Sequence, residues 1–340
     1  MLNIKIYLFT DYRDQFYFST RYRGACIDTH KLKRNFEKEG FEIIIKRFQD
    51  IDFRTENYTN EWVLYQSSED PNLLYKSYIE DIVLALKLQG AKLVPSFSYF
   101  RAHHNKVFME ILRDHIDIDE IKNIKSKGFG TYEEYSKSEI FNIDRSTIIK
   151  PGFGTRSRGI KLLNSKFKKI KHSKIASKSF TFDNFKLWLS KLKTGRDYTP
   201  MSNNRSKFII QEFISDIKGD YRILAYGEKY YCVYRENRSN NFRASGSGKL
   251  DFESAIPEGL LDYAKTVYTK FDTPFMSLDI GHKDGVFYLF EFQFMCLGQY
   301  TLEKSNFYYK DNGGSWDRVH EKPELEREFS RSVIDYINSR

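Results

Sequence analysis

Three oxygen-bearing side chains in the C-terminal part of the sequence have the types and spacing of a cation site. Glu291 and Gln293 lie two residues apart in one apolar run, and Asp279 lies in the run before it. Alternate strand residues share a face, and Asp279 can join the other two across a hairpin, for which Asp284 and Gly285 supply the turn. These oxygens suit a hard cation such as Mg²⁺, normally held by one or two carboxylates and a nucleotide's phosphates.

A glycine-rich stretch could supply the contacts to those phosphates. The strand-like run 147–150 ends in Lys150 and passes into a loop that contains Gly152, Gly154 and Gly159. Glycines let backbone N–H groups approach phosphates closely, and Lys150 adds positive charge beside them. The loop lacks the spacing of a P-loop, so we predict a strand-loop-strand flap, with a plain hairpin turn as the alternative.

Three arginines lie in or beside apolar segments between the flap and the cation site. Arg222 and Arg235 lie in a predicted hairpin over 219–235, and Arg243 lies in a second glycine-rich loop. An arginine on a strand is usually exposed or ion-paired. Three that approach one metal site would favour an anionic intermediate.

The first hundred residues predict a small, mostly parallel α/β lobe. Strands are expected at 4–9, 41–48, 61–66 and 92–94, with helices at 30–39 and 72–89 between them. Ligands of such sheets bind beyond the carboxyl ends of the strands, so 19–24 and 65–70 are the expected substrate loops. Further on, we expect helices at 103–115, 132–138, 181–193, 257–270 and 322–338, a strand at 207–214 and a loop over 296–322.

Composition and charge narrow the classes of protein. A chain of 340 residues is expected to fold as two or three lobes. The apolar runs are far shorter than the roughly 20 residues of a membrane span, so we expect a cytoplasmic protein. Its three cysteines, which have no CxxC spacing, indicate neither a disulfide framework nor a zinc site.

Positive charge is concentrated in one block. Residues 150–207 carry sixteen Lys or Arg against two Asp, a surplus of 14 charges, whereas the whole chain carries +9. A nucleic-acid groove, a solvated face, and a basic lid over a triphosphate and an anionic substrate are three interpretations of this block.

Taken in order, these stretches resemble the ATP-grasp superfamily, in particular its glutathione-synthetase-like and RimK-like carboxylate–amine ligases. The resemblance runs from about residue 105 to 298. Asn105-Lys106 resembles the start of the family's first ATP-binding helix, and the Lys150 loop resembles its flap. Gln211-Glu212-Phe213 resembles the adenine hinge. Asp220, Arg222 and Arg235 resemble its Asp-x-Arg and arginine strand pair, and the metal positions match Asp279, Glu291 and Gln293.

The resemblance implies an ATP-grasp fold preceded by a small parallel α/β domain. It implies an N-terminal domain at 1–103 and an ATP-grasp domain at 104–340, with a flap or lid at about 146–214 and a metal and phosphate subdomain at about 215–340. It also implies a reaction in which ATP phosphorylates a substrate carboxylate and an amine attacks the acyl phosphate, giving an amide. The cofactors would be ATP and one or two Mg²⁺ ions, or Mn²⁺.

Residue roles follow from the resemblance position by position. Lys106 and Lys150 would meet the α- and β-phosphates, the backbone of Glu212 and Phe213 the adenine edge, and Asp220 the ribose. Arg222, Arg235 and Arg243 would meet the γ-phosphate and the acyl phosphate. ATP contacts are also expected from Gly152, Gly154, Gly159 and Gln211, and metal contacts from Asp279, Glu291 and Gln293.

The sequence departs from the family at three positions. Gln293 stands where the last metal ligand is usually Asn, and Ser245 replaces an amide that commonly serves the active site. Asn105 replaces the usual Asp, a change that concerns local helix capping. One alternative within the same fold is a small-molecule kinase. The other is an anionic-polymer or nucleic-acid binder on a decayed scaffold, which the basic block and the changes at Gln293 and Ser245 favour, although we do not expect a nucleic-acid partner. Expected substrates are a small carboxylate and an amine, as an amino acid, a peptide or a carboxylated sugar; a homodimer is compatible with the sequence.

Overall fold

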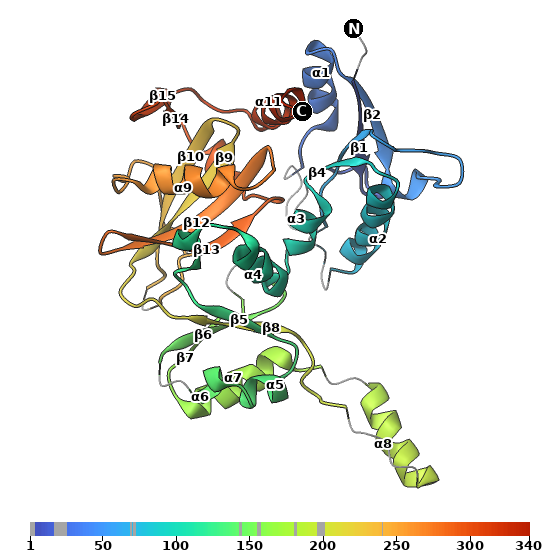
Figure 1. Cartoon of the computed structure of the whole chain (residues 1–340), viewed down its shortest axis with the longest axis vertical. Coiled ribbons are helices and arrows are strands. Elements are labelled where there is room, and N and C mark those ends of the chain that lie inside the picture. The colour runs from blue at the N-terminus through green and yellow to red at the C-terminus, as the bar shows by residue number, and fades with distance from the viewer. Residues whose placement is uncertain are drawn as a thin grey trace. The chain divides into compact units, whose positions relative to one another are not determined.

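The structure is a computed structural model (Figure 1). It describes residues 4–16, 26–68, 70, 73–142, 145–154, 158–179, 182–195, 201–239 and 241–340. The expected substrate loop at 19–24 lies outside the described residues. Contacts divide the chain into unit 1, residues 1–103, 219–236 and 249–340, and unit 2, residues 104–218 and 237–248. The functional division predicted at 103/104, 146–214 and 215–340 remains a prediction.

Unit 1 contains the predicted parallel sheet, which is confirmed. Its strand order is β2 (Glu42–Arg47), β1 (Lys5–Thr10), β3 (Trp62–Leu64) and β4 (Lys92–Val94), with all neighbours parallel. The helices of this lobe are α1 (Thr29–Lys38), α2 (Leu74–Leu88), α3 (Phe97–Ala102) and the short η1 (Phe48–Asp50). Asp28 begins α1, because its side chain accepts hydrogen bonds from the first free N–H groups of the helix.

A seven-stranded sheet forms the rest of unit 1. Its strand order is β13 (Val286–Gln293), β12 (Phe275–Lys283), β9 (Gly219–Tyr226), β10 (Lys229–Glu236), β14 (Phe307–Asp311) and β15 (Trp316–His320), and β11 (Leu250–Asp251) pairs with β10. The helices are α9 (Leu260–Thr269), α10 (Tyr300–Glu303) and α11 (Leu325–Asn338). The loop predicted at 296–322 is wrong, since α10 and the β14–β15 hairpin lie there. The hairpin was missed because most of β15 is polar and faces solvent.

One apolar core connects the two sheets of unit 1. It includes Leu32 and Phe36 of α1, Leu224 of β9, and Phe329 and Val333 of α11. The chain therefore cannot complete this core until its N-terminal and C-terminal segments have met.

Unit 2 is built on the antiparallel sheet β5 (Ser126–Phe129), β8 (Phe208–Glu212), β6 (Thr147–Pro151) and β7 (Lys161–Leu163). Its helices are α4 (Lys106–His115), η3 (Asp119–Lys122), α5 (Tyr132–Ser136), α6 (Glu139–Asn142), α7 (Lys166–Ser177) and α8 (Phe182–Thr194). Phe129, Tyr135 and Phe208 are central in its core. The sequence did not predict β5, which is polar and contains a glycine, or α7, whose many lysines hide its narrow buried stripe.

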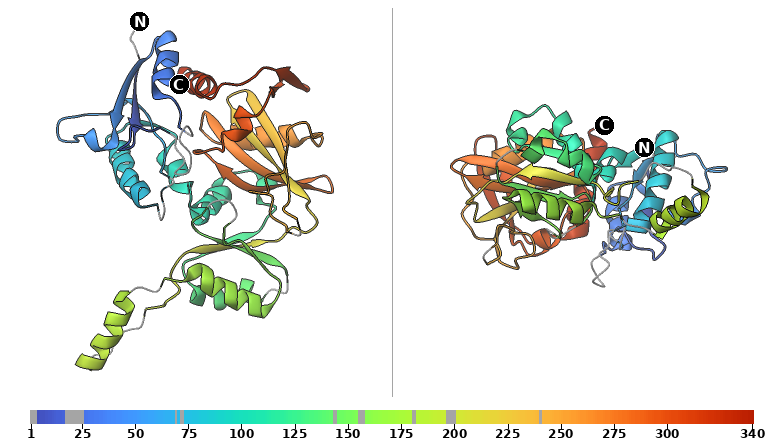
Figure 2. Two further views of the ribbon diagram at one scale, coloured as in Figure 1. Left: turned by 180° about the vertical axis from the view of Figure 1, so that it is seen from behind. Right: turned by 90° about the horizontal axis from the view of Figure 1, so that it is seen from below.

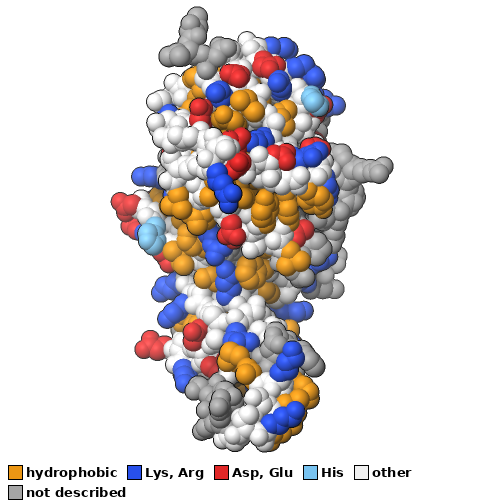
Figure 3. Space-filling view, turned by 90° about the vertical axis from the view of Figure 1, so that its right-hand side faces the viewer, with side chains coloured by type: hydrophobic (Ala, Val, Ile, Leu, Met, Phe, Trp, Pro, Cys, Tyr) orange, Lys and Arg blue, Asp and Glu red, His pale blue; other side chains and the backbone are white. Residues whose placement is uncertain are grey.

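The basic block of the sequence, residues 150–207, includes α7 and α8. Helix α8 stands apart from α5, α6 and α7 in each of the views in Figures 1 and 2. On the face drawn in Figure 3, Lys and Arg side chains are interspersed with hydrophobic and acidic ones. In the part of the chain that the structure describes, no helix is long and apolar enough to cross a bilayer.

Candidate active site

A row of charged side chains crosses four adjacent strands of the large sheet in unit 1. The strand register places Arg235 of β10 opposite Asp220 of β9, Arg222 of β9 opposite Asp279 of β12, and Asp279 opposite Glu291 of β13. Directly opposite residues share a sheet face, and so do residues two apart, such as Asp220 and Arg222. Five residues that the sequence analysis selected therefore lie on one face.

Arg222 holds Asp279 with two parallel hydrogen bonds. Its Nε donates to Oδ1 over 2.8 Å, and its Nη2 donates to Oδ2 over 2.9 Å. Nη1 donates to the hydroxyl of Tyr300 over 3.3 Å, so all three guanidinium nitrogens have partners. This fork geometry is the strongest arrangement for an arginine and a carboxylate, and it fixes the orientation of both groups.

Arg235 links the same carboxylate to Asp220. Its Nε and Nη2 donate to the two oxygens of Asp220 over 2.6 and 2.8 Å, and Nη2 lies 2.7 Å from Oδ2 of Asp279. Only 2% of the surface of Arg235 and 5% of that of Asp279 is exposed. The four side chains are thus a buried network with two positive and two negative charges.

The network keeps Asp279 ionised. Burial by itself would raise the pKa of Asp279, but the neighbouring Arg222 and Arg235 outweigh it and hold that pKa well below its usual value. Asp279 in turn raises the pKa of Arg222 against the opposing effect of burial. In this structure both carboxylate oxygens of Asp220, the predicted ribose contact, accept hydrogen bonds from Arg235.

Glu291 and Gln293 extend the row beyond the network. Gln293 lies opposite Ser277, and its Nε2 donates to Oε1 of Glu291 over 3.3 Å. The turn before them has the expected backbone, because Asp284 and Gly285 both have positive φ. Among the described residues there is no group of three or more His, Cys, Asp or Glu side chains that could hold a metal ion.

The donor set nevertheless fits Mg²⁺. Two carboxylates and an amide oxygen on one face are hard oxygen ligands, and Mg²⁺ usually takes only one or two carboxylates from a protein. Glu291 lies next to Asp279 across the strand pair, and both oxygens of Asp279 accept hydrogen bonds from Arg222. A cation at this face would therefore share the oxygens of Asp279 with that arginine.

The flap residues lie in unit 2. Asn105 caps α4 by accepting a hydrogen bond from the N–H of Phe108, and Lys106 follows as the first residue of the helix. The Nζ of Lys106 donates to the carbonyl of Gly154 over 2.9 Å, and its backbone N–H donates to the carbonyl of Gly152 over 3.0 Å. The start of α4 is thus tied to the glycine loop that follows Lys150 on β6.

Two glycines of the loop are required by close contacts. A Cβ atom on Gly152 would lie 2.6 Å from Cγ and 2.7 Å from the carbonyl oxygen of Lys207. A Cβ atom on Gly159, where φ is +74°, would lie 2.7 Å from Cγ of Pro151. Gly154 has nothing within 4 Å of its Cβ position, but its φ of +124° favours glycine. The predicted strand-loop-strand arrangement is present as β6 and β7.

The predicted adenine segment occupies the end of β8. Gln211 is buried, and its Nε2 has no hydrogen-bond partner among the described residues. The N–H of Glu212 donates to the carbonyl of Lys125 over 2.8 Å, and the N–H of Phe213 donates to that of Ser146 over 3.3 Å. A backbone contact from Glu212 or Phe213 to adenine would therefore have to use a carbonyl group or displace one of these bonds.

Arg243 belongs to unit 2, so the structure does not group it with Arg222 and Arg235. Its Nε donates to Oδ1 of Asn241 over 3.0 Å. Burial and then the positive charge of Arg238 lower the pKa of Arg243. The backbone N–H of Arg238 also donates to the carbonyl of Arg243 over 3.0 Å, so the two residues are paired within the loop.

Three residues near these sites were missed by the sequence analysis. The Nζ of Lys207 donates to Oδ1 of Asn105 over 2.8 Å and lies 4.5 Å from the ring centre of Phe153. The hydroxyl of Tyr300 accepts from Arg222, and the backbone N–H of Arg238 donates to the carbonyl of Arg243. Lys207 is the last residue of the basic block at 150–207, and that block was the signal that could have indicated it. Tyr300 and Arg238 lie in segments without a recognisable motif.

Solved structures that superimpose on nearly the whole of this chain identify its fold. The RiPP-associated ATP-grasp ligase of Chryseobacterium gregarium, in complex with ADP and a leader and core peptide, matches with a TM-score of 0.55 at 12% identity, over 98% of this chain and 97% of that one. D-alanyl-alanine synthetase A of Vibrio cholerae matches with a TM-score of 0.54 at 13% identity, over 100% and 98% of the two chains. D-cycloserine synthetase DcsG matches with a TM-score of 0.54 at 12% identity, over 97% and 99%.

The chain therefore has the ATP-grasp fold, with a small parallel α/β lobe at its N-terminus, as the sequence predicted. No protein-family model matches the sequence, and no curated protein matches it either.

Proposed function

We propose that this protein is an ATP-dependent carboxylate–amine ligase. The observation that carries the proposal is the row from Arg235 to Glu291 on one sheet face, within an ATP-grasp fold. ATP would phosphorylate the substrate carboxylate, and the amine would displace phosphate from the acyl phosphate to give an amide, ADP and phosphate. Phosphoryl transfer of this kind depends mainly on positioning and charge neutralisation, which fixed arginines supply.

Glu291, Gln293 and Asp279 would hold one or two Mg²⁺ ions, or Mn²⁺. When bound, the metal would neutralise charge on the transferred phosphoryl group. The network of Asp220 and Asp279 would keep Arg222 and Arg235 in place for the same group. Asp220 would act first as the support of Arg235, and its contact with ribose stays a prediction.

Unit 2 would bind the nucleotide. Lys106 and Lys150 would contact the α- and β-phosphates beneath the flap with Gly152, Gly154 and Gly159, and Arg243 would contact the γ-phosphate or the acyl phosphate. Adenine would be contacted by the buried amide of Gln211 and by the backbone of Glu212 and Phe213. The hydrogen bonds between Lys106 and the glycine loop support this proposal, since they connect two elements that would both contact phosphate.

The test combines nucleotide binding with turnover. Calorimetry should detect Mg·ATP binding, and a screen of carboxylate and amine pairs should find ADP release that requires both substrates. Glu291→Ala should then reduce turnover by a factor corresponding to about 2.7–4 kcal/mol, the usual effect of losing an electrostatic transition-state contact. Absence of Mg·ATP binding, or turnover of Glu291→Ala at the wild-type rate, would show that the proposal is wrong; ADP release with a single substrate would indicate a kinase.

A further inference from the structure

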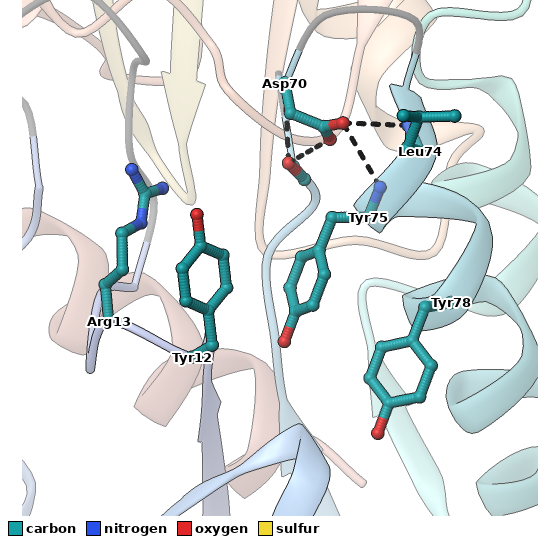
Figure 4. Close-up of a pocket in the computed structure, with 7 residues that line it drawn as sticks. Tyr12, Arg13, Asp70, Leu74, Tyr75 and Tyr78 are labelled. Atoms are coloured by element: carbon teal, nitrogen blue, oxygen red, sulfur yellow. Dashed lines mark hydrogen bonds between the residues drawn. The ribbon is translucent and has the colours of Figure 1, made fainter.

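A cavity of about 530 Å³ opens in the parallel-sheet lobe of unit 1 (Figure 4). Tyr12 and Arg13 follow the carboxyl end of β1, Ser68 and Asp70 follow β3, and the first turns of α2 complete the lining with Leu74, Tyr75 and Tyr78. This edge of a parallel sheet is where α/β proteins bind ligands. The cavity thus occupies a binding position that the functional proposal leaves without a ligand.

The polar groups at one end of the cavity are already used by the protein. Ser68 donates its hydroxyl to Asp70. The other carboxylate oxygen of Asp70 accepts from the N–H groups of Leu74 and Tyr75 over 2.8 and 3.2 Å, which caps α2. Arg13 donates from Nε and Nη2 to the buried carboxylate of Asp11 over 3.0 and 2.9 Å.

Phenol rings form the remaining wall. The rings of Tyr12 and Tyr75 lie 5.2 Å apart in an edge-to-face arrangement, and those of Tyr75 and Tyr78 lie 5.5 Å apart. The guanidinium carbon of Arg13 lies 5.2 Å from the ring centre of Tyr12. Burial, and then the nearby charge of Asp11, raise the pKa of Tyr75 to about 12, so this phenol stays neutral at physiological pH. Figure 4 shows the rings of Tyr12 and Tyr75 side by side in the lining of the cavity.

We propose that this cavity binds the aromatic side chain of an amino-acid substrate, either a free amino acid or one residue of a peptide. Aromatic rings pack favourably edge-to-face or offset against other rings, and a cation beside the wall strengthens such contacts. A carboxylated sugar would instead need a hydrogen-bond partner for each hydroxyl that it buries. Apart from the three phenol hydroxyls, the polar lining groups of Ser68, Asp70 and Arg13 already form hydrogen bonds within the protein. The inference rests on the ligase proposal, since it names the substrate class for that reaction.

Direct binding tests the proposal without requiring turnover. Both enantiomers of phenylalanine, tyrosine and tryptophan are compared with leucine, glutamate and glucuronate by saturation-transfer NMR and calorimetry, with and without Mg²⁺ and a nonhydrolysable ATP analogue. At least one aromatic amino acid should bind about 2- to 10-fold more tightly than leucine, which corresponds to the usual value of a ring contact. Binding of glucuronate or leucine in preference to every aromatic amino acid, or no binding of any aromatic one, overturns the proposal.

Matched variants assign the binding to this cavity. Tyr12→Ala should weaken binding of the aromatic amino acid about 2- to 10-fold, whereas Tyr12→Phe keeps the ring and should retain it. Leu74 and Leu88 begin and end the same helix and are 71% and 79% exposed, but only Leu74 lines the cavity. Leu74→Ala should therefore weaken binding, and Leu88→Ala should leave it unchanged. Equal affinities of wild type and Tyr12→Ala overturn the assignment.

The two proposals fail in different ways. Aromatic binding without any affinity for the ATP analogue would contradict the ligase proposal and leave the cavity assignment standing. Binding of the analogue, with no aromatic binding in its presence, would contradict the cavity assignment alone.

Discussion

Asp279 is the residue on which the charged row depends. It accepts hydrogen bonds from Arg222 and forms an ion pair with Arg235. Among the described ion pairs, Asp279 is the one carboxylate that both arginines contact. A buried charge that loses its partner is costly, because neither water nor another group replaces the lost interaction. Asp279 is therefore required for stability as well as for any role toward a cation.

Replacement of Asp279 by Asn should destabilise the fold strongly. Asp279→Asn leaves the buried Arg235 and the half-buried Arg222 with one carboxylate, so we expect a loss of about 3–5 kcal/mol in the free energy of unfolding. Urea unfolding followed by circular dichroism measures it. Glu291→Gln, on the neighbouring strand, is the control and should change stability by less than about 1 kcal/mol. Similar stabilities for the two variants would contradict the assignment of the network to Asp279.

The same residue predicts a pH dependence. The pKa of Asp279 is lowered in the folded protein, so its ionised form stabilises the fold above the unfolded-state pKa of about 3.9. That contribution is lost as the pH falls toward the folded-state pKa. The difference in unfolding free energy between wild type and Asp279→Asn should be constant from pH 5 to 7 and should shrink below about pH 4. Urea titrations at several pH values test this, and a constant difference down to pH 2 would contradict it.

At the scale of elements, the flap is positioned by contacts with α4 and β8. Gly152 donates its N–H to the carbonyl of Lys207 over 2.8 Å, and its own carbonyl accepts from the N–H of Lys106. Because the backbone of Lys207 approaches this closely, only a residue without Cβ fits at position 152.

Gly152→Ala should therefore strain the contact between the end of β6 and Lys207, which precedes β8. The new methyl group would lie 2.6 Å from Cγ of Lys207, and overpacking of this kind typically costs about 1–3 kcal/mol. Thermal unfolding should show a lower transition temperature. Gly314→Ala is the control, since nothing lies within 4 Å of its Cβ position, and its stability should stay within about 0.5 kcal/mol of wild type. An unchanged transition for Gly152→Ala would show that the loop relaxes freely.

At the scale of the whole molecule, unit 1 is assembled from three separate segments. The first hundred residues share an apolar core with β9, β12 and α11, and the rings of Phe16 and Phe329 lie 5.7 Å apart. Although the ATP-grasp resemblance begins near residue 105, the segment before it completes the hydrophobic core of the C-terminal sheet.

A chain truncated to residues 104–340 should consequently fail to fold cooperatively. Removal of Leu32, Phe36 and the rest of the N-terminal core residues would expose Phe329 and Val333 of α11 to water, at roughly 1.5–3 kcal/mol for each large side chain uncovered. Circular dichroism and urea titration measure the outcome. A single sharp transition in the truncated chain would mean that the shared core is dispensable.

Several features of this protein are determined by the local sequence alone. Alternating apolar residues and the Asp284-Gly285 pair specify the β12–β13 hairpin, because strand periodicity and turn conformation are local properties. The parallel lobe follows from its alternating strands and helices, and the order of the motifs was sufficient to indicate the ATP-grasp fold.

Only the tertiary structure decided how these side chains are paired. Asp279 lies 57 residues from Arg222 in the sequence, and which guanidinium reaches it depends on strand order and register, which are non-local. The same reason explains why β5 was missed, since its pairing partner β8 lies about 80 residues further along the chain. The β14–β15 hairpin is local and was missed because most side chains of β15 face solvent. The cavity that Tyr12 and Tyr75 line likewise exists only because these two residues, 63 positions apart in the chain, meet at one edge of the sheet.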